Sequence, residues 1–200
     1  MINSEKELNL QIKEAVPLLN KYWDLLLVWQ KSVNLISDKT IVNGWQRHIL
    51  DSAQLYFFIE KQSHILMDVG SGGGLPGIVL AILNKVLQGP LTKIILVESD
   101  LKKSLFLKEC ARELHLDIDV LRERIENVNI VPDVITARAF APLNVLLKLV
   151  DKNVSRETLL LLPKGKNVEE ELACHLEDYS FEKIKNIVNS EGCILKVKRG

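Results

Sequence analysis

The stretch ILMDVGSGGGLPG, residues 65–77, decides the fold of this chain. Its apolar beginning breaks into five glycines within positions 70–77, and a further apolar run follows at 78–82. This pattern predicts a buried strand, a tight turn and a packed helix. Glycine lets the backbone adopt positive φ and removes the Cβ atoms that would keep a ligand at a distance.

A second apolar run, residues 94–97, ends at Glu98. A carboxylate at the end of the second strand can accept hydrogen bonds from both hydroxyls of a ribose. The glycine turn and Glu98 together predict a nucleoside-cofactor site at the carboxyl edge of a parallel sheet.

From residue 64 onward the pattern alternates between strands and helices. We expect strands at 64–69, 93–98, 118–122, 133–137, 158–163 and 193–198, with a weaker one at 181–188. Helices are expected at 75–87, 101–114, 142–151 and 168–177. This alternation, with right-handed crossovers, predicts an α/β fold with a doubly wound, mostly parallel sheet.

Residues 5 to about 60 are expected to be helical, with a connection at 34–40. One apolar stripe follows helical spacing through Leu8, Ile12, Ala15, Leu19, Tyr22, Leu26 and Trp29. Pro17 predicts a break that opens a second helix, and a third helix is expected to start near Thr40 and to reach Ile59. We therefore expect a helical extension, residues 1–62, packed on a cofactor-binding domain, residues 63–200, in one globular unit.

Composition restricts the class of protein. The 26 basic and 26 acidic residues cancel, so a nucleic-acid partner would need a local basic face. The cysteines (Cys110, Cys174 and Cys193) and the four histidines follow no metal-binding spacing, which predicts reduced thiols and no metal. Without a signal-peptide core or an apolar run long enough to span a bilayer, we expect a cytoplasmic protein, and we favour a monomer.

Two glycine patterns overlap in the turn. Gly70-x-Gly72-x-Gly74 is typical of S-adenosylmethionine enzymes, whereas Gly72-x-Gly74-x-x-Gly77 fits the dinucleotide pattern. Gly70 is the residue that ends the strand, and Pro76 suits the first turn of a helix better than its interior, so the first pattern is favoured. An NAD(P)-dependent oxidoreductase remains the alternative.

The segment DVGSGGGLPG, residues 68–77, resembles the cofactor motif of the bacterial small-subunit (16S) rRNA guanine-N7 methyltransferases, also called glucose-inhibited division protein B. Further similar segments occur in the family's order, namely 29–35, 47–52, Glu98-Ser99, 124–126, 138–141 and 163–165. Two positions depart from the family pattern: Glu98 replaces an aspartate, and Ser190-Glu191-Gly192-Cys193 replaces a Gly-Glu-Arg-His segment. The resemblance implies a Rossmann-like class I methyltransferase that uses S-adenosylmethionine and acts on 16S rRNA of the small ribosomal subunit.

The resemblance also implies roles for single residues. Gly70 and Leu75 would line the cofactor pocket, Gly72 and Gly74 would shape the turn, and Glu98 would hold the ribose. Ile125 and Glu126 would flank the adenine. Arg138 would contact the cofactor, and Lys164 would meet an RNA phosphate or the target base; these two are the expected catalytic residues.

Arg47, His48, Asp51 and Ser52 are expected on successive turns of one helix, where the i,i+4 pairs Arg47–Asp51 and His48–Ser52 can touch. We expect this cluster to border the substrate cleft, with Arg47, His48 and Lys164 as substrate-binding residues.

Guanine N7 carries a free lone pair and no proton, so methyl transfer to it needs alignment and electrostatic stabilisation rather than a strong base. The Arg138-Ala139-Phe140-Ala141 segment, where exocyclic amine methyltransferases carry Asn-Pro-Pro-Tyr-like motifs, agrees with a ring nitrogen as the acceptor. A non-catalytic ribosome-associated binding module is the remaining alternative.

Overall fold

The computed structural model describes residues 2–173 and 178–200. Its helices are α1 (Glu5–Gln11), α2 (Val16–Gln30), α3 (Asp51–Ala53), α4 (Gly77–Val86), α5 (Leu101–Glu113), α6 (Leu143–Leu149) and α7 (Val168–Leu172). Its strands are β1 (Ile65–Val69), β2 (Lys93–Val97), β3 (Asp119–Leu121), β4 (Val134–Thr136), β5 (Leu159–Lys164), β6 (Tyr179–Lys185) and β7 (Cys193–Arg199). Short 3-10 turns cover Lys13–Ala15, Asp38–Thr40, Gln54–Phe58, Ile125–Asn127 and Asp151–Asn153, and Trp45–Leu50 is a π-helix.

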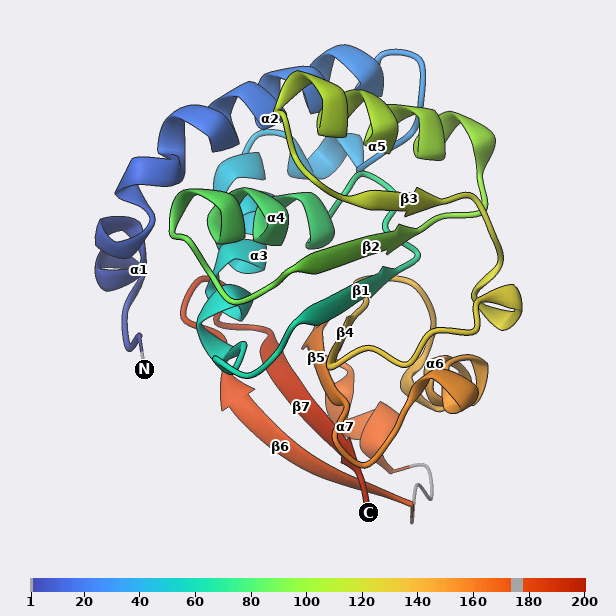
Figure 1. The fold of residues 1–200 in the computed structure, drawn as a ribbon. Coiled ribbons are helices and arrows are strands. Elements are labelled where there is room, and N and C mark those ends of the chain that lie inside the picture. The colour runs from blue at the N-terminus through green and yellow to red at the C-terminus, as the bar shows by residue number, and fades with distance from the viewer. Residues whose placement is uncertain (1, 174–177) are drawn as a thin grey trace.

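The strands form one sheet in the order β3-β2-β1-β4-β5-β7-β6 (Figure 1). The pairs from β3 to β5 are parallel, whereas β7 is antiparallel to both β5 and β6. The strand order reverses between the parallel strands β1 and β4, where the two halves of a doubly wound sheet meet and ligands bind beyond the strand ends. The predicted doubly wound, mostly parallel sheet is confirmed.

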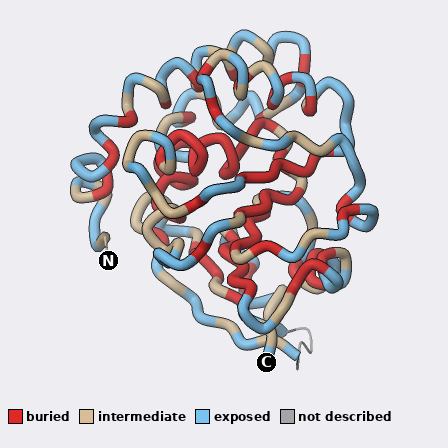
Figure 2. The backbone as a smooth tube through the Cα atoms, in the orientation of Figure 1, coloured by how far each residue is buried: buried red, intermediate tan, exposed pale blue. Residues whose placement is uncertain are grey.

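The buried strands are continuous apolar runs, and their alternate residues point to opposite sides of the sheet. Both faces of the sheet are therefore apolar. Leu66 and Leu96 pack with α4, α5 and the N-terminal helices, whereas Met67 and Ile95 pack with α6 on the other face. Figure 2 shows that the central strands and much of α4 are buried. The N-terminal helices therefore share one continuous core with the sheet.

The expectation for the N-terminal helices is correct in part. A 3-10 turn at Lys13–Ala15 interrupts the helix, and α2 begins with Pro17 in its first turn, as the proline predicts. A helix starting near Thr40 is wrong, because Thr40 ends a 3-10 turn and the helical segment begins at Trp45. That segment runs through a π-helix, α3 and a 3-10 turn to Phe58.

Two further differences concern the C-terminal part. The weakly expected strand at 181–188 is a full strand, β6 at Tyr179–Lys185, which pairs along its whole length with β7. Its apolar signal is weak because none of its residues is buried in this strand at the edge of the sheet. The expected helix at 168–177 is observed as α7 up to Leu172, and its last residues, with Cys174, lie outside the described residues.

Candidate active site

A cavity of about 900 Å³ lies at the carboxyl ends of β1 and β2. We call it the large cavity. It is lined by Asn34–Thr40, His48, Val69–Gly73, Leu75, Val97–Ser99, Lys103, Glu123–Glu126, Arg138–Phe140 and Leu149. Its walls thus come mainly from the glycine turn after β1, from the segments that follow β2, β3 and β4, and from the N-terminal extension.

The glycine turn needs glycine for two distinct reasons. Gly70, Gly72 and Gly74 all adopt positive φ, at 67°, 53° and 82°. A Cβ on Gly70 would lie 2.1 Å from the Phe140 ring, and a Cβ on Gly74 would lie 2.5 Å from Ile78 Cγ1. Gly70 and Gly72 line the large cavity, whereas Gly74 lies behind it and lets the turn pack against α4.

Asp68 anchors the turn from inside the core. Its Oδ1 accepts a hydrogen bond from Thr136 Oγ1 at 2.7 Å, and its Oδ2 accepts one from the Gly77 amide at 3.2 Å. Burial raises the pKa of this carboxyl from 3.8 to about 6, although the hydrogen bonds oppose that shift. Sequence reasoning missed this role; the available signal was a charged residue inside an apolar strand.

Glu98 connects the turns that follow β1 and β2. Its Oε2 accepts the Gly72 amide at 2.9 Å, and its Oε1 accepts the Asp100 amide at 2.8 Å. The residue is 8% exposed and lines the large cavity. Each carboxylate oxygen has a second lone pair, so the two amides fix the orientation of Glu98 and leave it able to accept hydroxyl donors.

Leu75, Ile125 and Glu126, which the sequence predicts as cofactor-binding residues, also line the large cavity. Ile125 is 3% exposed and presents an apolar side chain at the start of a 3-10 turn after β3. Glu126 is the exposed neighbour in the same turn. An apolar side chain beside an exposed carboxylate suits a flat ring with polar edges.

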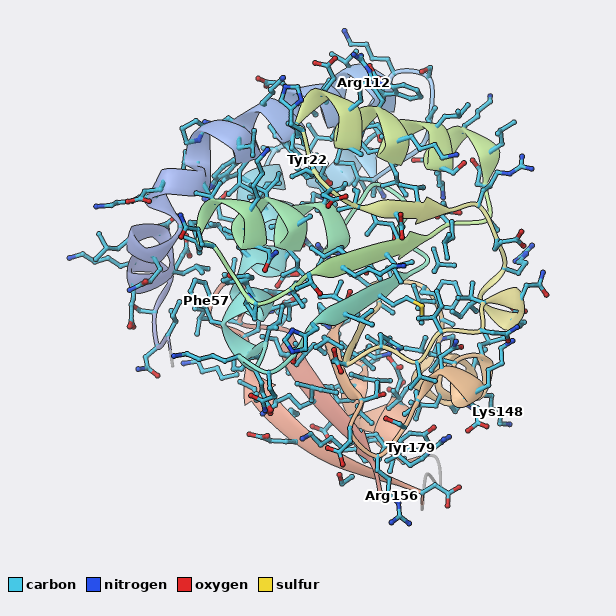
Figure 3. The ribbon with its side chains drawn as sticks, in the orientation of Figure 1. Tyr22, Phe57, Arg112, Lys148, Arg156 and Tyr179 are labelled. Carbon is cyan, nitrogen blue, oxygen red and sulfur yellow. The ribbon has the colours of Figure 1, made fainter. Side chains whose placement is uncertain are left out.

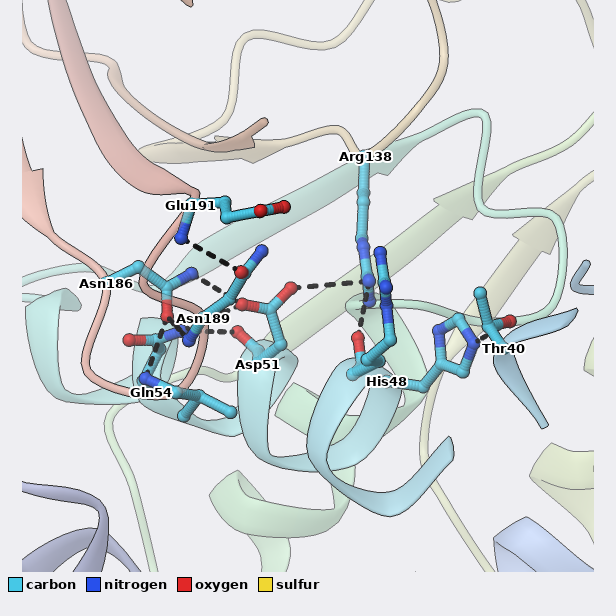
Figure 4. A network of polar contacts seen from close by, with 10 residues as sticks. Thr40, His48, Asp51, Gln54, Arg138, Asn186, Asn189 and Glu191 are labelled. Carbon is cyan, nitrogen blue, oxygen red and sulfur yellow. Dashed lines mark hydrogen bonds and ion pairs between the residues drawn. The ribbon is translucent and has the colours of Figure 1, made fainter. Parts of the chain in front are cut away.

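Arg138 follows β4 and faces the N-terminal extension rather than projecting freely (Figure 4). Its Nη2 donates to the Arg47 carbonyl at 2.5 Å and lies 3.3 Å from Asp51 Oδ2. Its Nη1 is buried and has no hydrogen-bond partner among the described residues. Burial lowers the pKa of Arg138, and the Asp51 carboxylate opposes that shift.

Asp51 belongs to a buried amide network that joins the extension to the connection between β6 and β7 (Figure 4). Asn186 Nδ2 donates to Asp51 Oδ1 at 2.6 Å, and Gln54 Nε2 donates to the same oxygen at 3.0 Å. Asn186 Oδ1 accepts the amides of Val188 and Asn189. The segment 186–189 is therefore tied through Asp51 to Arg138.

The predicted i,i+4 contacts are wrong. Arg47 is exposed and Asp51 pairs with Arg138 instead, while Ser52 Oγ is buried without a partner among the described residues. His48 Nε2 lies 2.8 Å from Thr40 Oγ1. The physical reason is the π-helix at 45–50, whose i→i+5 bonding shifts side chains away from the i,i+4 register.

His48 lies in the wall of the large cavity rather than on an open substrate surface. Its ring stacks on Trp23 with centroids 6.1 Å apart. Burial, and then the positive charges of Arg138 and Arg47, lower the pKa of His48 from 6.5 to about 4. The imidazole is therefore neutral at pH 7.

Lys164 does not line the large cavity. It lies in a neighbouring cavity of about 260 Å³, which we call the small cavity, together with Arg47. Its Nζ donates to Glu171 Oε2 at 2.7 Å. The two cavities share Arg138, Ala139 and Phe140. Of the two expected catalytic residues, Arg138 therefore lies in the boundary between the cavities and Lys164 lies on the side of the small cavity.

The N-terminal extension completes the large cavity, which the sequence did not predict. Tyr22, labelled in Figure 3, is fully buried, and its hydroxyl donates to the Gly73 carbonyl at 2.5 Å. Gln30 Oε1 accepts the amides of Leu35 and Ile36, and its Nε2 donates to Asp38 Oδ1. These contacts hold the segment 34–40 against the glycine turn.

Four basic residues that could contribute to a local basic face, Lys102, Lys108, Arg122 and Arg124, are all exposed. Arg112, at the outer surface in Figure 3, instead pairs with Glu109 and Glu113. The described residues contain no group of three metal-ligating side chains. Within the same ranges, no helix has the length and apolar character to cross a bilayer.

Comparison with known structures defines the class of the fold. A ribosomal protein L11 methylase from Lactobacillus delbrueckii subsp. bulgaricus superposes with a TM-score of 0.58 at 16% identity, covering 76% of this chain and 78% of that one. A SAM-dependent methyltransferase from Aquifex aeolicus gives a TM-score of 0.58 at 14% identity, covering 78% and 92%. The chain has the Rossmann-like fold of class I S-adenosylmethionine methyltransferases, as predicted.

Sequence comparison defines the family. The family model described as rRNA small subunit methyltransferase G matches residues 15–193. The ribosomal RNA small subunit methyltransferase G of Rickettsia felis is 40% identical over 187 residues, which cover 92% of this chain and 94% of that protein. This chain belongs to the rRNA small subunit methyltransferase G family. The predictions of that family, of a methyltransferase and of S-adenosylmethionine as its cofactor are confirmed.

The large cavity fits S-adenosylmethionine. Gly72 leaves open space where a Cβ would stand, and Ile125 presents an apolar surface. Glu98 presents a fixed carboxylate, and Arg138 Nη1 is a buried cationic donor without a hydrogen-bond partner among the described residues. A ribose, an adenine and an α-carboxylate each find a complementary group in this set. The NAD(P)-dependent oxidoreductase finds no support in the family match.

Proposed function

We propose that the protein transfers a methyl group from S-adenosylmethionine to N7 of a guanine in 16S rRNA of the small ribosomal subunit. Family membership supports the enzyme class, and the observation that carries the proposal at residue level is the large cavity, closed on one side by Arg138. When bound, the cofactor supplies a sulfonium-linked methyl group that guanine N7 accepts without losing a proton.

Different residues of the large cavity would bind different parts of the cofactor. Glu98, held by two backbone amides, accepts the ribose hydroxyls. Ile125 and Glu126 flank the adenine, while Gly70 and Leu75 line the wall. Arg138 Nη1 donates to the α-carboxylate, since it is a buried cationic donor at that wall and has no hydrogen-bond partner among the described residues.

The acceptor side would be formed by the small cavity. Lys164 donates to an oxygen of the target base or of an adjoining phosphate, and Arg47 stands exposed on the same rim. His48 is neutral and hydrogen-bonded to Thr40, so its role is to support the cavity wall rather than to bind phosphate.

No general base is required in this scheme. The N7 lone pair is available at neutral pH, and the ring gains positive charge as the new bond forms. The described residues therefore act by alignment and by excluding water, which are the main sources of rate for such a transfer.

The test is methyl transfer from labelled cofactor to under-methylated 30S particles and to protein-free 16S rRNA. We expect one labelled guanine, with the label at N7. Absence of transfer to both substrates, while S-adenosylhomocysteine still binds, would contradict the proposal and would favour a non-catalytic ribosome-associated module.

A further inference from the structure

The small cavity has the features of a base pocket. It is lined by Arg47, Asp51, Ala137–Ala141, Leu146, Pro163–Gly165, Glu171, Asn186 and Asn189. It opens beside the large cavity across Arg138, Ala139 and Phe140. A group bound in the small cavity would therefore face a group bound in the large one.

Glu171 offers the small cavity one unused carboxylate oxygen. Its Oε2 accepts the Leu143 amide at 2.7 Å and Lys164 Nζ at 2.7 Å. Its Oε1 accepts no hydrogen bond within residues 2–173 and 178–200. Because Oε2 is held from two sides, the carboxylate is fixed and Oε1 is ready to accept donors from a ligand.

Lys164 stands directly beside this oxygen with donors to spare. Its side chain is 10% exposed, and one of its three ammonium donors is used by Glu171. The small cavity thus presents a hydrogen-bond donor and an acceptor side by side on one wall.

Phe140 presents an aromatic face at the boundary of the two cavities. It is 38% exposed and lies against Gly70. The residue before it, Ala139, adopts a φ of 50°, which is strained for a residue with a side chain. Such strain is typical of loops that hold a functional side chain in place.

We propose that the small cavity binds the target guanine after it has been extruded from the RNA, and that Glu171 determines the choice of base. Glu171 Oε1 accepts from N1–H and the N2 amino group, Lys164 donates to the adjacent O6, and Phe140 stacks on the ring. This inference rests on the proposed function and deepens it. Enzymes that modify a base take it out of the stack into such a pocket.

The order of atoms on the base supports this assignment. In guanine, O6 lies next to N1–H on one side and next to N7 on the other. A base whose N1 edge meets Glu171 and whose O6 meets Lys164 has N7 on the part of the ring remote from Glu171. Adenine has an acceptor at N1 and a donor at position 6, so the same wall would leave its groups unpaired, which is a strong basis for rejection.

The test uses an RNA in which the guanine methylated by the wild-type enzyme is replaced by inosine, which keeps N7 and O6 but lacks the N2 amino group. We expect the wild type to prefer guanosine over inosine by roughly 10-fold or more in kcat/KM, since one hydrogen bond to a charged group is lost. Glu171→Gln should lower kcat/KM on guanosine by roughly 10- to 100-fold and reduce that preference to less than about 3-fold.

Glu170→Gln is the matched control, because Glu170 is the exposed neighbour on α7 and does not line either cavity. It should keep the wild-type preference for guanosine. Glu170→Gln should keep the wild-type melting temperature, whereas Glu171→Gln should melt at a lower temperature because the largely buried Lys164 loses its counterion. Both variants should keep the wild-type S-adenosylhomocysteine Kd, which shows that both fold.

The preference for guanosine over inosine distinguishes base recognition by Glu171 from a role that only positions Lys164. If Glu171 only held Lys164 in place, Glu171→Gln would slow both RNAs equally and would keep the wild-type preference, and that result would overturn the inference while leaving the proposed function intact. If the wild type methylated no guanine at all, the proposed function and the pocket would fall together.

Phe140→Leu supplies a second variant that leaves the hydrogen-bonding wall untouched. We expect it to raise KM for RNA by roughly 10-fold, in the range of one lost stacking contact, while the preference for guanosine over inosine stays at the wild-type value. A KM within twofold of the wild type would overturn the stacking role.

Discussion

The glycine turn and the Arg138 side of the active site are built in opposite ways. The turn is contiguous in sequence, and its conformation follows mainly from residues 68–77, with distant side-chain hydrogen bonds to Glu98, Tyr22 and Thr136. The Arg138 side is assembled from the extension, from the end of β4 and from the β6–β7 connection, through Asp51, Gln54 and Asn186 (Figure 4). A local sequence motif can therefore predict where a cofactor lies. The residues that orient the reacting groups are instead held by contacts between segments far apart in the sequence.

The two regions should also differ in how a substitution acts. Damage to the turn strains the backbone locally. Damage to the Arg138 side leaves a buried charge without its counterion, which is among the more costly events in a protein interior.

The largest effect is expected from Asp51→Asn. The change keeps an oxygen for Asn186 and Gln54 but removes the negative charge opposite Arg138, whose guanidinium is largely buried. We expect the free energy of unfolding, measured with urea, to fall by about 3 kcal/mol. The control is Asp151→Asn at the exposed pair with Arg199, where the loss should not exceed about 0.5 kcal/mol. Equal losses at both positions would contradict a special role for the buried network.

The next effect is expected from Gly74→Ala. The residue has a φ of 82°, and the new Cβ would lie 2.5 Å from Ile78 Cγ1. We expect a loss of roughly 2 kcal/mol in the free energy of unfolding, together with weaker binding of S-adenosylhomocysteine in calorimetry. Gly165→Ala is the stability control, because its Cβ would meet no atom within 4 Å. A Gly74→Ala protein as stable as the wild type would refute the strained turn.

A smaller, pH-dependent effect is expected from His48→Gln. The folded state lowers the pKa of His48 from 6.5 to about 4, so the unfolded chain binds the extra proton first as pH falls. Wild-type stability should therefore decrease between pH 6.5 and pH 4, whereas the glutamine variant lacks this loss. We expect the stability difference between the two proteins to change by roughly 2 kcal/mol between pH 7 and pH 4.5.

Asp68 has the opposite effect on stability in part of this range. Burial raises its pKa to about 6, so its protonation stabilises the folded state as pH falls. Its contribution is common to both proteins and cancels in the difference. A difference that is constant with pH would show that His48 is not held neutral by the fold.

The smallest effect is expected from Tyr22→Phe. The change leaves the buried Gly73 carbonyl without its donor, at a cost of about 1 kcal/mol in the free energy of unfolding. Tyr56→Phe is the control, because Tyr56 makes no side-chain hydrogen bond within the described ranges. Because Tyr22 supports the glycine turn, its variant should also bind S-adenosylhomocysteine more weakly, while the Tyr56 variant should not.

The sequence predicted the sheet well, because buried parallel strands are continuous apolar runs. β1, β2 and β5 lie within one residue of their expected starts. It failed at Trp45–Leu50, since a π-helix differs from an α-helix by its hydrogen bonding and leaves no separate pattern in the residues.

The candidate site likewise has a part that the sequence predicted and a part that it could not predict. Gly70, Glu98 and Ile125 line the large cavity as expected, because each follows a strand directly and parallel strands end at one edge. The partners of Arg138 could not be predicted, since Asp51 and Asn186 approach it only through tertiary packing. Tyr22 was recognised as part of an apolar stripe, but nothing in that stripe indicates that its hydroxyl meets the glycine turn.

The account depends on the large cavity as the cofactor site, and a crystal structure with S-adenosylhomocysteine tests this most directly. We predict the ribose hydroxyls on Glu98, the adenine beside Ile125 and the carboxylate within hydrogen-bond distance of Arg138 Nη1. A complex in which the ligand lies elsewhere, or in which the ribose contacts neither oxygen of Glu98, would contradict it.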